Sequence, residues 1–433
     1  MRSRIVTLAV ILGGVAVVAL WWPSAVVSLS PSTLSTAIAE LVGMVGSYLV
    51  CVQVLLIARI PWFERMVGLD RLVAWHRIVG TTTLFLILAH VSFMTLGQWV
   101  TAGGGPVHAY LGLFGLYPDM LTATIGTAIM LGAGLLSAGA LRRLLPYELW
   151  YWTHVTFYLA IFLTFLHQIS AGPVFAGHPG HRAIWMALYG GTAACVVWWR
   201  AVAPLRHFSV HRFQVVAVVP ESRRMTSVWI RSNRPELLKA KAGQFMLFRF
   251  LAWGHLLTAH PYSISNVPQD GLLRITVADL GDHSGALKHV QPGTKVIVEG
   301  PFGGFFGRRR RAAAVLLIAG GAGIGPIRGL AEQFARMGRN VVVVYRASAL
   351  DDLALYHEVA ALPGVHLIPL VGRRAELGYD PLEAARLARA VPDIQHRETL
   401  ICGPEPMIAR VRESLTDLGI PDRKIHSEEL SFA

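Results

Sequence analysis

The sequence predicts a multidomain protein: a six-helix transmembrane bundle, an antiparallel β-barrel domain, and an α/β domain built on a parallel sheet. Three observations lead to this prediction. The first half of the 433-residue chain contains long apolar windows, the middle contains short alternating apolar runs, and the last third alternates buried strands with helices. We expect the bundle at residues 1–206, the barrel at 207–308 and the α/β domain at 309–433.

The composition agrees with a chain that is partly embedded in a membrane. Charged residues make up only 15% of the sequence, whereas soluble proteins average about 25%, so a wholly soluble or disordered chain is not expected. The cysteines, Cys51, Cys195 and Cys402, are far apart in the sequence. They therefore predict neither a disulfide framework nor a CxxC zinc, iron–sulfur or CxxCH haem-attachment site.

Six apolar windows predict six membrane spans, because each has about the 20 residues that a helix needs to cross a bilayer. They cover residues 5–27, 36–58, 75–97, 120–141, 149–169 and 183–203. The first window also resembles a signal peptide. Its apolar run is too long for one and no clean A-x-A site follows, so we favour a retained helix.

The arginines in the loops set the orientation of these spans. Arginine clusters at residues 2–4, 59–71, 142–143 and 200–212 fall on one side of the membrane, and the opposite loops hold only Arg182. The positive-inside rule therefore places both termini in the cytoplasm of a multi-pass protein of the plasma (inner) membrane. Because this topology accounts for much of the net charge of +13, no nucleic-acid partner is expected.

Two of the spans carry two histidines each, although polar side chains are costly inside a bilayer. Both spans run outward, so His76 and His154 lie near the inner face, and His90 and His167 lie about 20 Å further out at 1.5 Å per residue. Neutral imidazole is a good axial ligand for haem iron. The four histidines therefore predict two bis-histidine haems that carry electrons through the membrane.

The spacing is not equally favourable on the two helices. At 3.6 residues per turn, His90 returns to within about 40° of His76, whereas His167 lies about 140° from His154. We therefore expect the fifth span to be tightened, tilted or irregular. The alternative is that these histidines form interhelical hydrogen bonds or line a proton path. Histidines of the outer loops, His108, His178 and His181, either bind a metal acceptor or are simply solvated.

After Arg206 the apolar runs shorten and alternate, as in half-buried strands. Residues 213–219, 227–231, 244–250, 272–278 and 295–299 predict the strands of a small antiparallel barrel. In the last third, strands at 315–319, 341–345, 366–370 and 399–402 alternate with helices that end near residues 336, 361 and 418, which predicts a parallel sheet. The intervening run Arg308-Arg309-Arg310-Arg311 is either a solvated linker or a membrane-surface contact.

Three short motifs are candidate binding elements. Gly320-Gly321-Ala322-Gly323-Ile324-Gly325-Pro326 lies between a strand and a helix, where glycines let the backbone approach a pyrophosphate and Pro326 suits the first helical position. His260-Pro261-Tyr262-Ser263-Ile264-Ser265 places an aromatic ring and hydroxyls where they suit a flavin, or is an ordinary strand with a buried tyrosine. Gly281-Asp282-His283-Ser284 is either a second pyrophosphate site or a plain helix cap.

With these residues assembled, the sequence resembles the ferric reductase/NADPH oxidase superfamily over nearly the whole chain. His76-x13-His90 and His154-x12-His167 match the haem-ligand spacings of that superfamily. The motif HPYSIS resembles its H-P-[FY]-[ST] flavin motif. The resemblance implies two b-type haems and an FAD whose isoalloxazine contacts Tyr262 and Ser263 and whose phosphates lie near His260. The implied FAD site comprises His260, Pro261, Tyr262, Ser263, Ser265, Gly281, His283 and Ser284.

The resemblance also implies a nicotinamide site. GGAGIGP looks like the dinucleotide loop of the superfamily, with Gly320, Gly321, Gly323, Gly325 and Pro326 as its binding residues. Cys402-Gly403-Pro404 resembles the C-G-P motif that places a cysteine beside the nicotinamide ring. In the tail, Glu428 is implied near the transfer site and Phe432 on the flavin face. Leu430 departs from the family, where close bacterial relatives often have phenylalanine, and Met94 replaces a histidine that animal oxidases place near oxygen.

The expected function is a transmembrane oxidoreductase. Cytosolic NADPH or NADH gives a hydride to FAD, and electrons then pass singly through the inner and outer haems to oxygen or a ferric chelate outside. Arg346 follows a strand of the α/β domain, where a guanidinium suits the 2′-phosphate of NADPH, or it is a surface arginine. Phe157 or Phe162 either shortens the gap between the haems or packs against lipid.

Two other functions fit parts of the pattern. The chain is alternatively an electron-transfer subunit that serves an extracytoplasmic protein or a quinone, and such a subunit would be inert until that partner is added. It is otherwise a non-redox membrane protein whose cytosolic domain senses a nucleotide, and such a protein would bind no haem.

Overall fold

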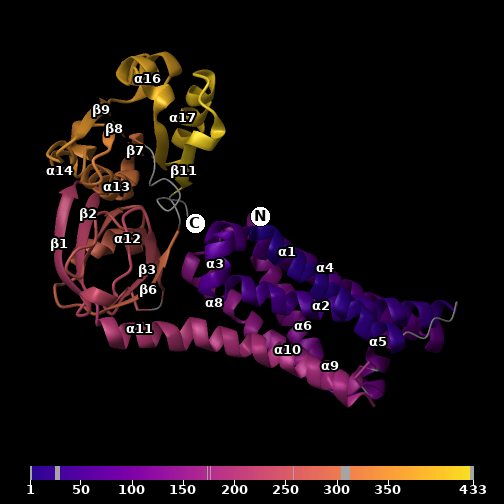
Figure 1. The fold of residues 1–433 in the computed structure, drawn as a ribbon. Helices are drawn as coiled ribbons and strands as arrows, with labels where there is room; N and C mark the ends of the chain where they lie inside the picture. The colour runs from indigo at the N-terminus through magenta and orange to yellow at the C-terminus, as the bar shows by residue number, and fades with distance from the viewer. Residues whose placement is uncertain are drawn as a thin grey trace. The chain divides into compact units, whose positions relative to one another are not determined.

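A computed structural model describes residues 2–24, 30–172, 174–175, 177–256, 258–303 and 313–429. The chain divides into two compact units, Met1–Val202 and Ala203–Ala433. The described part of the first unit is helical, and the strands of the described chain all lie in the second (Figure 1). The predicted domain boundaries at 206 and 308 remain predictions, and residue 308 lies outside the described residues.

The first unit is a bundle of antiparallel helices. Its described α-helices are α1 (Arg2–Trp21), α2 (Pro31–Ile57), α3 (Pro61–Val67), α4 (Leu69–Ala102), α5 (Gly105–Leu116), α6 (Met120–Leu136), α7 (Gly139–Arg142), α8 (Tyr147–Val155), α9 (Phe157–Ala171) and α10 (Pro179–Val197). The long helices α2 and α4 pack against each other along their length, as do α6 and α9 (Figure 1). The histidines of the intramembrane site described below lie on α4, α8 and α9.

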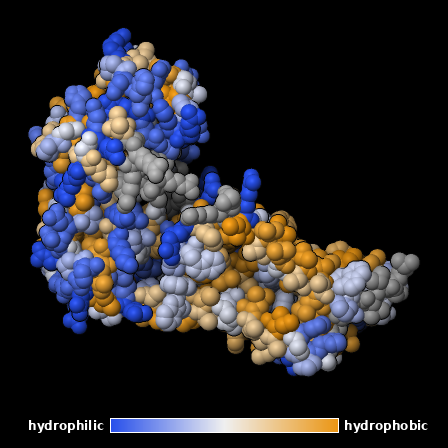
Figure 2. All heavy atoms as spheres, in the orientation of Figure 1, coloured by the Kyte–Doolittle hydropathy of each residue, from blue (hydrophilic) through white to orange (hydrophobic). Residues whose placement is uncertain are grey.

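Four stretches of helix in the described residues are long and apolar enough to cross a membrane. They are Ser3–Trp21, Pro31–Ile57, Arg71–Ala102 and Glu148–Ala171, and the apolar helix Met120–Leu136 is shorter. The predicted count of six spans therefore stays a prediction. Apolar side chains cover much of the visible face of this unit (Figure 2), and Leu8, Leu12 and Phe85 are each more than half exposed, as expected of side chains in contact with lipid.

Two local features of this bundle differ from regular spans. Residues 105–116, expected in an outer loop, form α5, because glycines at positive φ end α4 and a proline opens the next helix. The fifth window breaks into α8 and α9 at Thr156, whose N–H donates to the Thr153 carbonyl at 3.2 Å. This tightened turn confirms the expected irregularity between His154 and His167.

The second unit begins with α11 (Ala203–His211) and two three-stranded antiparallel sheets. One sheet has the order β1 (Gln214–Ser222), β2 (Met225–Arg231), β5 (Leu272–Ala278), and the other β4 (His260–Ser263), β3 (Phe245–Phe250), β6 (Val296–Phe302). Isolated bridges at Gln214–Lys295 and Ile264–Ile275 join the two sheets. Side chains of both sheets contribute to one apolar core. The antiparallel strands are confirmed, β4 agrees with the strand given as the alternative for residues 260–265, and closure into a barrel stays a prediction.

The last third forms a five-stranded parallel sheet, as predicted. Its order is β11 (Ile425–Glu429), β10 (Glu398–Gly403), β7 (Ala314–Gly320), β8 (Asn340–Ala347), β9 (Val365–Val371), so β11 was missed. Helices α13 (Ile324–Arg336) and α14 (Tyr356–Ala360) pack on one face, and α16 (Ala384–Ala390) and α17 (Glu405–Asp417) on the other. The strand order reverses between β7 and β10, and ligands of such sheets bind where the carboxyl ends of these strands diverge.

A buried ion pair joins the antiparallel sheets to the parallel sheet. Arg274 on β5 is 0% exposed, and its guanidinium donates to both carboxylate oxygens of Glu358 on α14 at 2.8 and 2.9 Å. Arg274 also donates to the hydroxyl and the carbonyl of Ser265, and Arg328 donates to Glu358 at 3.0 Å. A buried charge needs such partners, so this pair fixes how the two halves of the unit meet.

We predict that Glu358→Ala lowers the stability of the second unit by about 3 kcal/mol, because it leaves the buried Arg274 charge uncompensated while the lost carboxylate was itself partly exposed. For a unit of this size, the midpoint of thermal unfolding in detergent should fall by roughly 6–12 °C. Asp351→Ala, which removes an exposed ion pair with Arg223, should leave the midpoint nearly unchanged. Equal midpoints for both variants would contradict the role of the buried pair.

Candidate functional site

The structure brings the four intramembrane histidines together as two facing pairs. The ring centres of His76 on α4 and His154 on α8 are 6.0 Å apart, and those of His90 on α4 and His167 on α9 are 6.3 Å apart. Two metal–imidazole bonds of about 2 Å each, plus the two ring radii, add up to about 6 Å. Each pair therefore has the separation that one metal ion between two imidazoles requires.

Hydrogen bonds fix which ring nitrogen of the α4 histidines faces the gap. Nδ1 of His76 lies 3.1 Å from the Gln53 carbonyl oxygen, and Nδ1 of His90 lies 2.8 Å from the Ala39 carbonyl oxygen. A carbonyl only accepts, so Nδ1 must carry the proton in both rings. This leaves the Nε2 lone pair of each ring available to a metal, which is the usual arrangement of ligating histidines.

The same accounting applies to His154. Its Nδ1 lies 3.1 Å from the hydroxyl of Ser137, which donates its proton to the Ala133 carbonyl and accepts from the indole N–H of Trp150. With its proton committed, the Ser137 hydroxyl accepts from His154, so Nδ1 is again the protonated nitrogen. Nδ1 of His167 is buried and has no hydrogen-bond partner among the described residues.

The outer pair opens into a cavity between the helices. The cavity has a volume of about 160 Å³ and is lined mainly by apolar side chains of the first unit, together with His90, His167 and Met94. Gly43 on α2 faces this space, and a Cβ there would lie 2.5 Å from Nδ1 of His90. Because Gly43 has no side chain, the His90 ring fits beside α2. The Ala39 carbonyl that accepts from this ring lies one helical turn before Gly43.

The donor set suits haem better than a metal held by protein alone. Within the described ranges no group of three or more His, Cys, Asp or Glu side chains is arranged so that it could hold a metal ion. Haem iron needs only two axial ligands from the protein, and each histidine pair supplies two. Phe157 and Phe162 were the candidates for shortening the gap between the haems. The ring centre of Phe157 lies 5.1 Å from that of His154, whereas Phe162 is 61% exposed and so does not lie between the histidine pairs.

In the second unit, three histidines and a tyrosine meet at the predicted flavin site. The rings of His260 on β4 and His283 on α12 (Asp282–Ala286) stack with their centres 3.6 Å apart. His255, which the sequence did not single out, lies with Nδ1 2.9 Å from Nε2 of His283. The Tyr262 hydroxyl is 3.5 Å from the other nitrogen of His283. The structure thus brings together two segments that the sequence predicted separately.

His283 and His255 are neutral in the folded unit at neutral pH. Burial, followed by the nearby rings of His260 and His255, lowers the pKa of His283 to about 3, and burial lowers the pKa of His255. A phosphate beside such a ring favours its protonated form, because the negative charge stabilises the proton on the imidazole. In this way the cluster suits the pyrophosphate of FAD.

Several other residues of the predicted flavin site make local contacts. The Ser265 hydroxyl is fully buried and accepts from Arg274 and Thr276. The Ser284 hydroxyl donates to the Gly281 carbonyl and accepts from the Leu280 N–H. Pro261 pairs with Leu247 in the sheet, next to Ser263. Ser265 thus serves the core, and Gly281 is the N-cap residue of α12, which has no side-chain capping hydrogen bond.

The glycine turn lies at the carboxyl end of β7, where the strand order reverses. Gly321 has φ +53, and a Cβ at Gly323 would lie 2.0 Å from the Cys402 carbonyl oxygen on β10. A Cβ at Gly320 would collide with Met407 of α17, whereas Gly325 has ordinary contacts. These glycines therefore let the turn lie against β10. The sequence suggested that Pro326 is the first residue of a helix. Helix α13 begins at Ile324, so Pro326 is its third residue.

The Cys402-Gly403-Pro404 segment meets this turn from the neighbouring strand. Cys402 is fully buried and pairs with Ala319 on β7 and with Glu428 on β11. Burial, followed by the charge of Glu428, raises the pKa of the Cys402 thiol well above its usual range, so the thiol stays protonated. Gly403 packs on Met407, and Pro404 caps α17. Phe432 and Leu430 lie outside the described residues.

Arg346 lies near the end of β8, opposite Gly320 in the register. Its guanidinium donates to the backbone carbonyls of Ala347, Leu370 and Gly372. Burial, followed by the charge of Arg374, lowers the pKa of Arg346. The group is thus at the strand ends where a nucleotide would bind, and its contact with a 2′-phosphate remains a prediction.

Comparisons with known proteins agree with this arrangement. Residues 42–165 match the family model of the ferric reductase like transmembrane component, and residues 207–305 match a FAD-binding domain model. The chain is therefore a membrane protein with a FAD-binding domain. It belongs to the ferric reductase/NADPH oxidase superfamily.

Relatives resemble only part of the chain. A flavohemoprotein of Xylella fastidiosa is 28% identical over 231 residues, covering 50% of this chain and 58% of that protein. The glycine betaine monooxygenase reductase subunit of Chromohalobacter salexigens is 27% identical over 50% of this chain and 63% of that protein. The solved FAD/NAD-binding domain of a Vibrio cholerae nitric oxide dioxygenase has a TM-score of 0.44 and 22% identity, covering 51% of this chain and 98% of that domain. The chain thus spans less than two thirds of the length of the flavohemoprotein and of the monooxygenase reductase subunit.

Sequence reasoning missed the residues that hold the ligand histidines in place. Gly43 and Ser137 carried a weak signal, because small residues inside membrane spans mark close helix contacts. The carbonyls of Ala39 and Gln53 carried none, since every residue has a carbonyl. His255 is one of 17 histidines, and only the fold brings it to His283.

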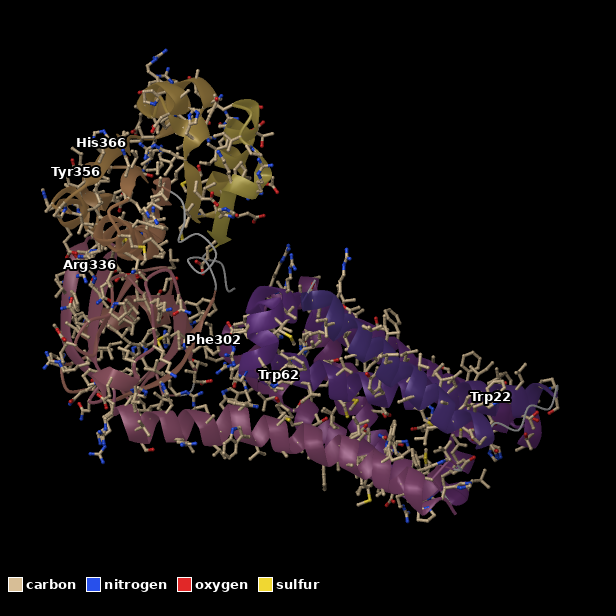
Figure 3. The ribbon with its side chains drawn as sticks, in the orientation of Figure 1. Trp22, Trp62, Phe302, Arg336, Tyr356 and His366 are labelled. Atoms are coloured by element: carbon tan, nitrogen blue, oxygen red, sulfur yellow. The ribbon has the colours of Figure 1, made fainter. Side chains whose placement is uncertain are left out.

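We predict that the second unit loses stability in mild acid. The folded pKa of His283, about 3, lies below the ordinary value near 6.5, so its contribution is present above pH 6.5 and is lost as the pH falls toward 3. The midpoint of thermal unfolding of flavin-free protein should fall from pH 7.5 to pH 5, and His283→Gln should flatten this dependence. His366→Gln, at an exposed site on β9 (Figure 3), should behave as the wild type. A wild-type slope retained in His283→Gln would refute this assignment.

Proposed function

We propose that this protein carries electrons from cytosolic NAD(P)H through FAD and two bis-histidine b-type haems to an acceptor on the outer face of the plasma membrane. The two facing histidine pairs carry this proposal. Their separations and the three fixed Nδ1 protons leave Nε2 lone pairs directed to two metal ions at different depths. Interhelical hydrogen bonding, the alternative role, would need no such matched pairs.

The residues of the second unit would bind the electron donor and the flavin. The glycine turn at Gly320–Gly323 and the Cys402–Pro404 segment meet at the strand reversal, a position that suits the nicotinamide dinucleotide. His260, Tyr262 and His283 would hold FAD. When bound, FAD accepts a hydride and passes on single electrons, which haem iron requires. The protonated, buried Cys402 would exclude water from the transfer site without acting as a nucleophile.

In the first unit the protein sets the ligands of the two haems. Gln53, Ala39 and Ser137 would orient His76, His90 and His154, so each ring presents Nε2 to iron. The cavity at the outer pair is where a small acceptor such as oxygen or a ferric chelate would meet the outer haem. With the arginine-rich loops in the cytoplasm, both termini and the second unit would lie on the inner side.

The test is an anaerobic visible spectrum of the detergent-purified protein, loaded with haem and FAD, before and after NADPH. Sharp reduced b-type bands are expected, and NADH serves as the second donor. His90→Ala should lose the outer haem and keep the inner one, so the haem content should fall from two to about one per chain. Reduction by dithionite but by neither nicotinamide would refute the donor assignment, and a chain without haem would refute the proposal.

We further predict that Gly43→Ala loses the outer haem. The new methyl group would lie 2.5 Å from Nδ1 of the buried His90, so the ring must move and leave the Ala39 carbonyl. The haem content should approach one per chain by the pyridine haemochrome assay. Gly132→Ala on α6, where a Cβ meets no heavy atom within 4 Å, is the matched control and should keep both haems. Full haem content in Gly43→Ala would contradict this account.

A further inference from the structure

Glu40 places a carboxyl group in the cavity at the outer histidine pair. It lies on α2 and lines the same cavity as His90 and His167. In the described helical stretches that are long and apolar enough to cross a membrane, acidic residues occur only at Glu40 and at Glu148, the first residue of its stretch. An ionisable side chain inside a span is costly, and for this reason it usually has a function.

The position of Glu40 along α2 places it at the outer end of the electron path. It directly follows Ala39, whose carbonyl accepts from His90. It precedes Gln53, whose carbonyl accepts from the inner histidine His76, by 13 residues, which is about 20 Å of helix. The carboxyl group therefore belongs to the outer pair and not to the inner one.

The surroundings of this carboxyl group suit a proton donor. The indole of Trp21 hydrogen-bonds to Glu40, and Tyr117 lies close enough to interact with its charge. Among the described residues Glu40 has no ion-pair partner. Because an unpaired carboxylate is costly in apolar surroundings, such a group holds a proton until a base takes it.

Other polar groups of the cavity have their protons committed. The Nδ1 proton of His90 goes to the Ala39 carbonyl, and Nε2 is the nitrogen left for iron. The Thr124 hydroxyl donates to the Met120 carbonyl, so the Tyr110 hydroxyl donates to Thr124. These groups are therefore poor sources of a proton for a molecule in the cavity, whereas the carboxyl group of Glu40 is a good one.

We propose that Glu40 donates a proton to the electron acceptor, so that the acceptor is a molecule that gains a proton at oxygen when it is reduced, dioxygen or a quinone, and not a ferric chelate. The inference rests on the proposed function, which brings electrons to this cavity. For dioxygen, one electron from the ferrous outer haem and one proton from Glu40 give a hydroperoxyl radical and ferric haem. For a quinone, two electrons and two protons give the quinol. The O–H bond of Glu40 breaks as that of the acceptor forms, and the carboxylate then regains a proton from the outer aqueous phase.

The experiment follows reoxidation of the haems in the full chain in detergent, reduced beforehand with a stoichiometric amount of dithionite. The reduced protein is mixed by stopped flow with dioxygen, with a short-chain benzoquinone or with ferric citrate. Glu40→Gln should slow the reaction with dioxygen or with the quinone by about 100-fold or more, the effect of losing a general acid, and should not slow the reaction with ferric citrate. Glu40→Asp should recover part of the rate. Glu148→Gln removes an exposed carboxyl group that does not line the cavity and should change none of the rates.

Two further measurements report on the proton itself. Redox-difference infrared spectra of the wild type should contain a carboxylic acid C=O band that Glu40→Gln lacks. Reoxidation of the wild type by dioxygen or the quinone should be slower in heavy water, because a proton moves as the acceptor is reduced, whereas reoxidation by ferric citrate should show no such effect.

The outcomes separate this inference from the proposed function. A wild-type chain that binds no haem refutes the proposed function, and reduction by dithionite makes the test independent of the nicotinamide and flavin sites. If the wild type binds two haems, wild-type rates of Glu40→Gln with both dioxygen and the quinone overturn the inference. Equal slowing with ferric citrate also overturns it, because it indicates a structural role. If Glu40→Gln loses the outer haem, the absence of a heavy-water effect in the wild type overturns the inference without need of a variant.

Discussion

The hydrogen bonds that backbone carbonyls of α2 accept from histidines of α4 are the constraint on which the intramembrane site depends. Inside a bilayer an imidazole N–H finds no water, so it must donate to protein. Ala39 and Gln53 accept from His90 and His76, and these bonds set both ring orientation and tautomer. Gly43 leaves the space that the outer ring occupies. One packed helix pair thus prepares two ligand positions at two depths.

The spacing of the two histidines on α8 and α9 is less favourable than that on α4. Thirteen residues separate His154 from His167, a spacing that a regular helix would turn to different sides. The chain breaks at Thr156, and both rings then face their partners on α4. For His154, the hydroxyl of Ser137 replaces the carbonyl as the fixed acceptor. A helix break and a hydroxyl acceptor on one side, and backbone carbonyl acceptors on the other, therefore produce the same arrangement of rings.

The second unit depends on a comparable principle, in which buried polar groups are paired across an internal boundary. Arg274 and Glu358 join the antiparallel sheets to the parallel sheet, and His255 and His283 join two loops at the flavin site. Glycines at 320 and 323 bring the turn after β7 against the end of β10. The polar pairs join segments that are distant in the sequence, and the glycines let the turn approach β10.

The sequence by itself determined the membrane character, the parallel sheet and the four intramembrane histidines, because hydropathy and residue spacing are local properties of the chain. It also located the glycine turn and the segments around His260 and His283. Only the tertiary structure decided that the histidines face each other, that Gly43, Ser137 and two carbonyls hold them, and that His255 contacts His283. These relations join residues distant in the sequence, and packing alone brings such residues together.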